Sequence, residues 1–326
     1  MAMNTRRIAA VLALALAPLA APVLAQEAFP ARTVKLVVPN PPGGLPDTVA
    51  RTIGQRLAEK WGQQVVIENK PGANGVVAAQ VITSAPPDGY TLLVTDSSMF
   101  SVNPLLYRDL PYDARKDFTA VSLTARAPLF LALHPSVPAS TFTEFVALVK
   151  SKPGQISYGS SGVGSTHHLT MESIKAALGL DIAHIPYKGT GQSVPALLGN
   201  QVAAVFSAMP SIAGAVRENR VRLIAVNAAQ RSELAPNVPT IAESGIPGFD
   251  FAPTIGFSGP ANMPPALAAR IAADIAEVVK SPAMQDSLRT LGIEPIGGSP
   301  QDYAALLAAD RERFAKAVKA SGISAE

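Results

Sequence analysis

The sequence contains no cysteine, and this absence excludes several classes of protein. Disulfide scaffolds, thiolate metal sites and cysteine nucleophiles all need a residue that the chain does not have. Charge is also scarce, because only 16% of the residues are charged and 27 Lys and Arg nearly balance 24 Asp and Glu. The chain has no basic stripe with interleaved aromatic residues, so the sequence predicts no nucleic-acid partner. Its 326 residues are enough for two domains or one large one.

The first 25 residues have the pattern of a cleavable signal peptide. A basic pair precedes an apolar stretch over residues 8–21, and residues 23–25 read Val-Leu-Ala, which fits the small-x-small cleavage pattern. The apolar stretch is short for a transmembrane helix, although a retained membrane anchor is the alternative. We expect residues 1–25 to be removed and the mature, exported chain to begin at Gln26.

A proline- and glycine-rich loop follows the first apolar run of the mature chain. Residues 34–38 are a predicted strand, and a helical pattern with Val49 and Ile53 four residues apart begins after the loop. Gly43 and Gly44 have no Cβ, so a ligand can approach their backbone closely. Free N–H groups at the start of the helix attract an anion, and Asp47 stands where a cap or first-turn residue belongs. The alternative is a rigid strand-to-helix loop without a ligand.

A second loop repeats this arrangement far along the chain. Residues 158–165 read Tyr-Gly-Ser-Ser-Gly-Val-Gly-Ser, between a predicted strand over 156–158 and a predicted helix over 165–178. If the two loops face one another across a cleft, they can hold one anionic ligand between them.

Strands and helices alternate along most of the sequence. Predicted strands over 64–69 and 91–96 join the first one, and a helix over 75–84 lies between them, which favours a parallel sheet. Ligands bind at the carboxyl ends of such strands, where the first loop and Ser97-Ser98 lie. The remaining predicted strands cover 129–133, 183–187, 202–207, 221–226 and 254–259, and the C-terminal predicted helices cover 264–280, 283–291 and 300–321.

A set of short motifs runs through the mature chain in an order that is specific as a whole. The motifs are Val38-Pro39, Pro41-Pro42-Gly43-Gly44, Asp47, Ala50-Arg51, Asn69-Lys70-Pro71-Gly72-Ala73, Gly75, Pro87-Asp88-Gly89-Tyr90-Thr91-Leu92-Leu93, Asn103-Pro104, Pro111-Tyr112-Asp113, Lys116-Asp117-Phe118, residues 158–165, His168-Leu169, Ile185-Pro186-Tyr187-Lys188-Gly189, Leu197-Leu198, Val238-Pro239-Thr240 and Glu243-Ser244-Gly245. In these motifs the chain resembles the extracytoplasmic solute receptors of tripartite tricarboxylate transporters, also called Bug or TctC-like receptors.

The resemblance implies an α/β fold of the two-lobed periplasmic-binding-protein kind, type II-like. Each lobe is expected to hold a mostly parallel sheet flanked by helices, with a ligand cleft between the lobes. Residues 26–124 and 252–326 would form lobe 1, and residues 125–251 would form lobe 2. The implied function is capture of a di- or tricarboxylate in the periplasm and its delivery to a membrane permease, by a monomer that needs no cofactor and is not an enzyme.

The resemblance also implies which residues bind the ligand. In such receptors two facing loops hold one carboxylate, partly through ordered water, and further side chains line the cleft. The expected ligand-binding residues are Pro42, Gly43, Gly44, Asp47, Ser97, Ser98, Ser160, Ser161, Gly164, Ser165, His168, Ser207 and Ala208.

Three departures from the family pattern bear on the ligand. Asn40 replaces an aromatic residue, Ala196 replaces an acidic one, and Ser207-Ala208-Met209 stands where many members carry polar residues. Met209 suggests a softer, more apolar pocket, so we also consider an aromatic or otherwise less polar carboxylate as the ligand.

Other functions remain as alternatives. A sensor subunit that reports ligand to a membrane kinase is one, and a secreted serine hydrolase built on Ser161 and His168 is another, although Val163 breaks the Gly-x-Ser-x-Gly elbow. His167 and His168 point about 100° apart on a helix and are poorly placed to share a metal, so no metal site is predicted. Lys188 either contacts an anion or is a solvated lysine after a strand.

Overall fold

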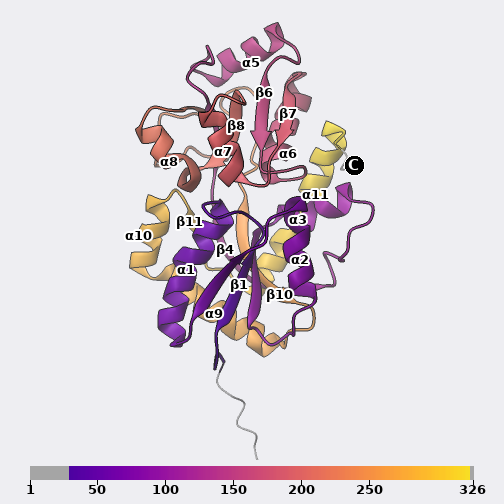
Figure 1. Ribbon diagram of the computed structural model, residues 1–326, viewed down its shortest axis with the longest axis vertical. Helices are drawn as coiled ribbons and strands as arrows, with labels where there is room; N and C mark the ends of the chain where they lie inside the picture. Colours follow the sequence, from indigo (N-terminus) through magenta and orange to yellow (C-terminus); the bar gives the residue numbers. More distant parts are fainter. Residues whose placement is uncertain (1–28, 324–326) are drawn as a thin grey trace, which may run out of the picture. The chain divides into compact units, whose positions relative to one another are not determined.

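The computed structural model describes residues 29–323, so the expected signal peptide at residues 1–25 lies outside the described part. Residues from Arg32 onward form one compact unit, which contains all the elements discussed below. This unit is built on two β-sheets, each bordered by helices (Figure 1). None of the helices within the described residues is both long and apolar enough to cross a membrane.

The first sheet has six strands in the order β11-β4-β10-β3-β1-β2. These strands are β1 (Val34–Val38), β2 (Val65–Asn69), β3 (Thr91–Asp96), β4 (Phe118–Arg126), β10 (Thr254–Pro260) and β11 (Glu294–Pro295). β1 runs parallel to β2 and β3, as the alternation of strands and helices predicts, whereas β10 runs antiparallel to both β3 and β4. The sheet is therefore mixed, whereas the family resemblance implies a mostly parallel sheet in each lobe. The antiparallel pairs arise because β10, which returns from the second sheet, runs opposite to its neighbours β3 and β4.

The second sheet has five strands in the order β7-β6-β8-β5-β9. These strands are β5 (Leu129–Leu133), β6 (Ser157–Ser160), β7 (Ala183–Pro186), β8 (Ala204–Ala208) and β9 (Arg222–Val226). β6 is parallel to β7 and β8, and β5 is antiparallel to β8 and β9. The chain passes from the first sheet to the second at residues 127–128 and returns to the first sheet at β10.

Helices follow most of the parallel strands and complete each layer. Next to the first sheet are α1 (Leu45–Trp61), the short 3-10 helix η2 (Ala73–Gly75), α2 (Val76–Thr83), α3 (Ser98–Ser101), α4 (Asn103–Leu106), α9 (Pro265–Lys280), α10 (Pro282–Thr290) and α11 (Pro300–Ser321). The helices that belong to the second sheet are α5 (Phe142–Ser151), α6 (Thr166–Leu178), α7 (Thr190–Leu198) and α8 (Met209–Arg217).

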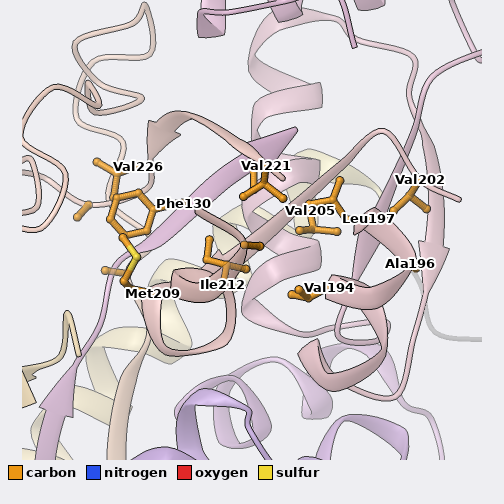
Figure 2. Packing of buried hydrophobic residues seen from close by; sticks show 14 residues of the cluster. Phe130, Val194, Ala196, Leu197, Val202, Val205, Met209, Ile212, Val221 and Val226 are labelled. Carbon is orange, nitrogen blue, oxygen red and sulfur yellow. The ribbon is translucent and has the colours of Figure 1, made fainter. Parts of the chain in front are cut away.

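The second sheet packs its own hydrophobic core against α7 and α8 (Figure 2). Phe130 and Val205 from the strands meet Met209 and Ile212 from α8, and Ala196 from α7 belongs to the same buried cluster. Met209 and Ala196, two of the departures from the family pattern, therefore contribute to packing in this core. A carboxylate at position 196 would be buried among apolar side chains here, which is unfavourable without a partner.

Helix α11 contacts elements of both sheets. It packs against β4 and α3 next to the first sheet and against α6 of the second (Figure 1). Phe314 of α11 is buried in a cluster with Val102, Leu106 and Leu169. Because these residues come from α3–α4, α6 and α11, the cluster joins the two halves of the unit beside the loops that follow β3 and β6.

Candidate functional site

A cavity of about 210 Å³ lies where loops after strands of the two sheets meet. The first sheet contributes the ends of β1, β2 and β3, and the second contributes the ends of β6 and β7. The lining residues are Pro39, Asn40, Gly72, Ala73, Asn74, Gly75, Thr95, Asp96, Ser98, Met99, Tyr107, Ser161, Gly162, Val163, Ser165, Tyr187 and Lys188. The cavity thus occupies the carboxyl ends of parallel strands, where α/β proteins bind ligands.

The loops of the two sheets touch each other beside this cavity. The Ser211 hydroxyl donates to the carbonyl oxygen of Gly43 at 2.8 Å, which links α8 to the first loop. Gly189 lies so close to Pro41 that a Cβ there would be 2.5 Å from Pro41 Cδ. A Cβ on Gly164 would be 2.8 Å from Leu106 Cδ1. The structure therefore presents the cleft in a closed arrangement.

Asp47 fixes the first loop from inside. Its carboxylate accepts hydrogen bonds from the Gly43 amide at 2.9 Å, from Asn69 Nδ2 at 2.8 Å and from Arg51 Nε at 3.0 Å. Burial acts to raise the pKa of Asp47, but the hydrogen bonds from Arg51, Asn69 and Gly43 outweigh it and hold the pKa below its usual value. Asp47 is buried and does not line the cavity, so its carboxylate shapes the loop.

The end of β3 places three polar residues in a row, and each has a different partner. Asp96 Oδ1 accepts hydrogen bonds from the Ser98 amide at 2.9 Å and from the Ser98 hydroxyl at 2.5 Å. The Ser97 hydroxyl instead donates to Asp310 of α11. Asp96 and Ser98 therefore line the cavity, whereas Ser97 points to α11. Burial raises the pKa of Asp96, and the neighbouring Asp310 raises it further.

Two hydroxyls hold the second loop in shape. Ser165 caps α6 by accepting a hydrogen bond from the His168 amide, and it donates to the Gly162 carbonyl at 2.7 Å. Ser160 contacts His184 Nε2 at 2.7 Å. The Gly164 amide donates to His168 Nδ1 at 3.1 Å, so this amide is already used within the loop.

Ser161 stands between the cavity and a buried histidine. Its hydroxyl is 2.6 Å from His167 Nδ1, while His167 Nε2 is enclosed with no hydrogen-bond partner among the described residues. Burial lowers the pKa of His167 to about 4, so the ring is neutral at pH 7. In a hydrolase a third group would orient this base at its other nitrogen. Ser161 and His167 lack such a third group among the described residues. Their contact therefore fits a hydroxyl held in place by a histidine better than it fits a catalytic triad.

Two more histidines pack behind the loop. His168 and His184 stack with ring centroids 4.0 Å apart, and Tyr158 stacks on His184 at 4.9 Å. Burial lowers the pKa of His168 to about 4 and that of His184 to about 3, and the neighbouring His168 lowers the latter further. Within residues 29–323 no group of three or more His, Cys, Asp or Glu side chains is arranged to hold a metal ion.

The structure brings some of the predicted ligand-binding residues to the cavity and leaves others outside its lining. Ser98, Ser161 and Ser165 line the cavity. Those outside the lining are Pro42, Gly43, Gly44, Asp47, Ser97, Ser160, Gly164, His168, Ser207 and Ala208. Most of these support the lining loops, and Ser207 and Ala208 are buried in β8. Ligand contact by each of these residues stays a prediction.

Several lining residues are absent from the predicted set. Asn74, Asp96, Tyr107 and Tyr187 line the cavity, together with Lys188, for which the sequence left two roles open. Asp96 ends a predicted strand next to Ser97-Ser98, so its position at a carboxyl end was a signal for it. Tyr107 and Asn74 belong to segments whose path depends on tertiary packing, and no local pattern marks them.

Comparisons with known proteins identify the family to which the chain belongs. The family model described as "Tripartite tricarboxylate transporter family receptor" matches residues 49–323. Protein BugT of Bordetella pertussis is 33% identical over 323 residues, which cover 98% of this chain and 99% of BugT. A structure from R. palustris solved with adipate has a TM-score of 0.89 at 34% identity, and the match covers 91% of this chain and 100% of that one.

A second solved structure contains a different bound acid. MatC from Rhodopseudomonas palustris with bound malate has a TM-score of 0.84 at 31% identity, over 89% of this chain and 100% of MatC. The two-lobed periplasmic-binding-protein fold predicted from the sequence is confirmed by these neighbours and by the two sheets. The chain therefore belongs to the tripartite tricarboxylate transporter family of receptors, which are periplasmic solute-binding proteins.

Proposed function

We propose that this protein captures a small organic carboxylate between its two lobes and delivers it to a tripartite tricarboxylate transporter-type permease. Residues 1–25 would direct its export to the periplasm, where it would act as a monomer without enzymatic activity. Lobe 1 would comprise residues 26–124 and 252–326, and lobe 2 residues 125–251. The observation that carries the proposal is Ser161, which lines the cavity and whose hydroxyl is positioned by His167 Nδ1 at 2.6 Å.

The size and lining of the cavity support a small acid. Its volume of about 210 Å³ lies below the range of roughly 300–1,000 Å³ that is usual for drug-sized ligands. Lys188 adds a cation to the lining, and none of the ion pairs within the described residues includes it. Adipate and malate in the sites of two relatives are acids of a suitable size.

The tautomer of His167 determines whether the Ser161 hydroxyl can donate a hydrogen bond to a ligand. A buried N–H without an acceptor is rarer in proteins than an acceptor without a donor. Because His167 Nε2 has no partner in the described part of the chain, the proton belongs on Nδ1, where it donates to the Ser161 oxygen. The Ser161 hydroxyl proton is then free to point into the cavity, where it can donate to a carboxylate.

The proposal is tested by titration calorimetry on the chain that begins at Gln26. Adipate, malate, tricarboxylates and benzoate serve as ligands, and the corresponding amides serve as neutral controls. We expect binding by at least one acid and not by its amide. Loss of one hydrogen bond to a charged group in Ser161→Ala should weaken that acid by about tenfold to a hundredfold.

Ser140→Ala is the matched control, because Ser140 is an exposed serine outside the cavity lining. Unchanged affinity in Ser161→Ala, or equal binding of acids and amides, would contradict the proposed site. A role in sensing remains the alternative to transport, and uptake of the bound acid by cells that lack or carry the permease separates the two.

A further inference from the structure

The cavity has a carboxylate of its own in its wall. Asp96 is the single acidic residue among the lining residues. Its Oδ1 is occupied by the Ser98 amide and hydroxyl, whereas its Oδ2 accepts no hydrogen bond from any described residue. Oδ2 is also not among the enclosed, unpartnered side-chain atoms of the described chain. One carboxylate oxygen is therefore left to a molecule in the cavity.

Within the described residues no cation is paired with Asp96. Neither Asp96 nor Lys188, which also lines the cavity, belongs to any ion pair of this part of the chain. The nearby groups on α11 are Asp310 and Tyr303, and Asp310 is itself paired with Arg313 at 2.8 Å. The second sheet supplies Ser161, Tyr187 and Lys188, none of which is bonded to Asp96. An ionised Asp96 would therefore be a negative charge in the cavity wall that no described cation offsets.

A ligand with negative charge alone fits this wall poorly. In a cavity of about 210 Å³ a second carboxylate would lie near Asp96, and two like charges in contact with little water repel strongly. A ligand that carries a cation toward Asp96 and an anion toward Lys188 and Ser161 satisfies both ends. Such placement of opposite charges gives specificity, because it rejects molecules with the wrong charge at either end.

We infer that the ligand is an amine-bearing carboxylic acid, whose ammonium group donates to Asp96 Oδ2 while its carboxylate is held by Ser161 and Lys188. This inference rests on the proposed function and narrows it to one class of acid. Burial and Asp310 raise the pKa of Asp96, and a ligand ammonium offsets both effects by favouring the ionised carboxylate. The competing possibility is a protonated Asp96 that donates to the second carboxyl group of a diacid.

Matched ligands separate these two possibilities. Titration calorimetry compares succinate, glutarate and adipate with β-alanine, 4-aminobutyrate and 5-aminopentanoate, in which an ammonium replaces one carboxylate. Aspartate, glutamate and 2-aminoadipate, which add an ammonium to each diacid, complete the series. We expect the best binder to be one of the amine-bearing acids.

Asp96→Asn tests the role of the residue itself. The amide oxygen of Asn can still accept both hydrogen bonds from Ser98, so the end of β3 keeps its shape, while the NH₂ group now faces the ligand. Binding of the amine-bearing acid should weaken by about tenfold to a hundredfold, and binding of the diacids should strengthen. Lys188→Gln should weaken both series, and Asp109→Asn, an exposed residue outside the lining, should change neither.

A pH series on the unaltered protein provides a second readout that does not depend on any variant folding. Affinity for an amine-bearing acid should fall as the pH drops through the raised pKa of Asp96, whereas a diacid bound through a protonated Asp96 should bind more tightly there. If diacids bind best and Asp96→Asn does not weaken them, the inference is overturned and the proposed function stands. If no acid of any series binds, both are overturned.

Discussion

Two buried histidines, His167 and His168, and the half-buried His184 surround the loop that carries Ser160 and Ser161. Each ring has a partner that uses one nitrogen, and burial lowers the pKa of all three to between about 3 and about 4. They are therefore neutral in the folded protein at pH 7. In an unfolded chain the same rings take up a proton near pH 6.5. Below about pH 6.5 these three rings therefore bind fewer protons in the folded protein than in the unfolded chain.

This difference predicts a loss of stability on mild acidification. Between about pH 6.5 and pH 4 the unfolded state binds more protons than the folded state, so the free energy of unfolding falls as the pH falls. Each histidine contributes up to about 1.4 kcal/mol per pH unit in this window, and nothing above it. Denaturant unfolding at pH 7 and pH 5 measures the loss.

A variant identifies the source of the loss. His167→Asn keeps a polar group near the position of Nδ1 but has no proton to gain, so the variant should lose less stability than the unaltered protein between pH 7 and pH 5. His134→Asn is the control, because His134 bonds Ser136 away from this cluster. Equal losses in the two variants would contradict the assignment to His167.

At the scale of elements, the second loop and α6 depend on left-handed glycines at both ends. Gly164 precedes the helix with φ +79°, and Gly179 follows it with φ +64°. A Cβ at Gly164 would meet Leu106 of α4 at 2.8 Å, whereas a Cβ at Gly179 would meet nothing within 4 Å. Both positions require a residue that tolerates a positive φ. Only Gly164 also lies against α4, which belongs to the first sheet's side of the cleft.

These glycines form a matched pair of substitutions. Gly164→Ala and Gly179→Ala should each lower the free energy of unfolding by about 1–2 kcal/mol, because alanine is strained at a positive φ. Only Gly164→Ala should also weaken ligand binding, since the added methyl group pushes α4 and the second loop apart. Unfolding and calorimetric titration of both variants test this, and equal ligand affinity in the two would refute the contact's role.

The sequence predicts the elements well where the apolar pattern is plain. The strands at β1 and β3 and the three C-terminal helices agree with prediction to within a residue or so at each end. β4 is absent from the predictions, although its sequence, Phe-Thr-Ala-Val-Ser-Leu-Thr-Ala-Arg, partly alternates polar and apolar residues, as is typical of a strand with one solvent-exposed face. Ser122 and Thr124 are nevertheless buried in it, and Ser122 donates to the Gly298 carbonyl. Such burial depends on β10 and β11, which come more than a hundred residues later.

The candidate site, like the fold, is predictable where the local sequence pattern is clear and not where it depends on distant parts of the chain. Glycine and serine content marked both loops, and three of the predicted serines do line the cavity. Asp47 holds the first loop through its hydrogen bonds with Asn69 and Arg51. Asn69 reaches Asp47 only because β2 pairs in parallel with β1, and this pairing cannot be read from the local sequence. Met209 suggested an apolar pocket from its position in sequence, but its side chain packs in the core of the second sheet (Figure 2). Side-chain direction at a strand end is set by the fold and is not readable from a motif.

Across the whole described unit, the loops and helices of the two sheets contact each other directly. Ser211 and Gly43 join them on one side of the cavity, and the cluster around Phe314 joins them on another. Each sheet supplies only part of the cavity wall, so a ligand that touches both walls favours the closed arrangement by its differential affinity for it. This property is what a receptor needs if a membrane partner is to distinguish loaded from empty protein.

The most direct test of the account is a crystal structure of the chain with its tightest-binding acid. We predict that the ligand carboxylate lies in the 210 Å³ cavity, within hydrogen-bonding distance of Ser161 Oγ, with loops of both sheets touching the ligand. A ligand bound instead in the groove lined by Arg126, Arg231 and Arg289, with the cavity between the sheets left empty, would contradict the account.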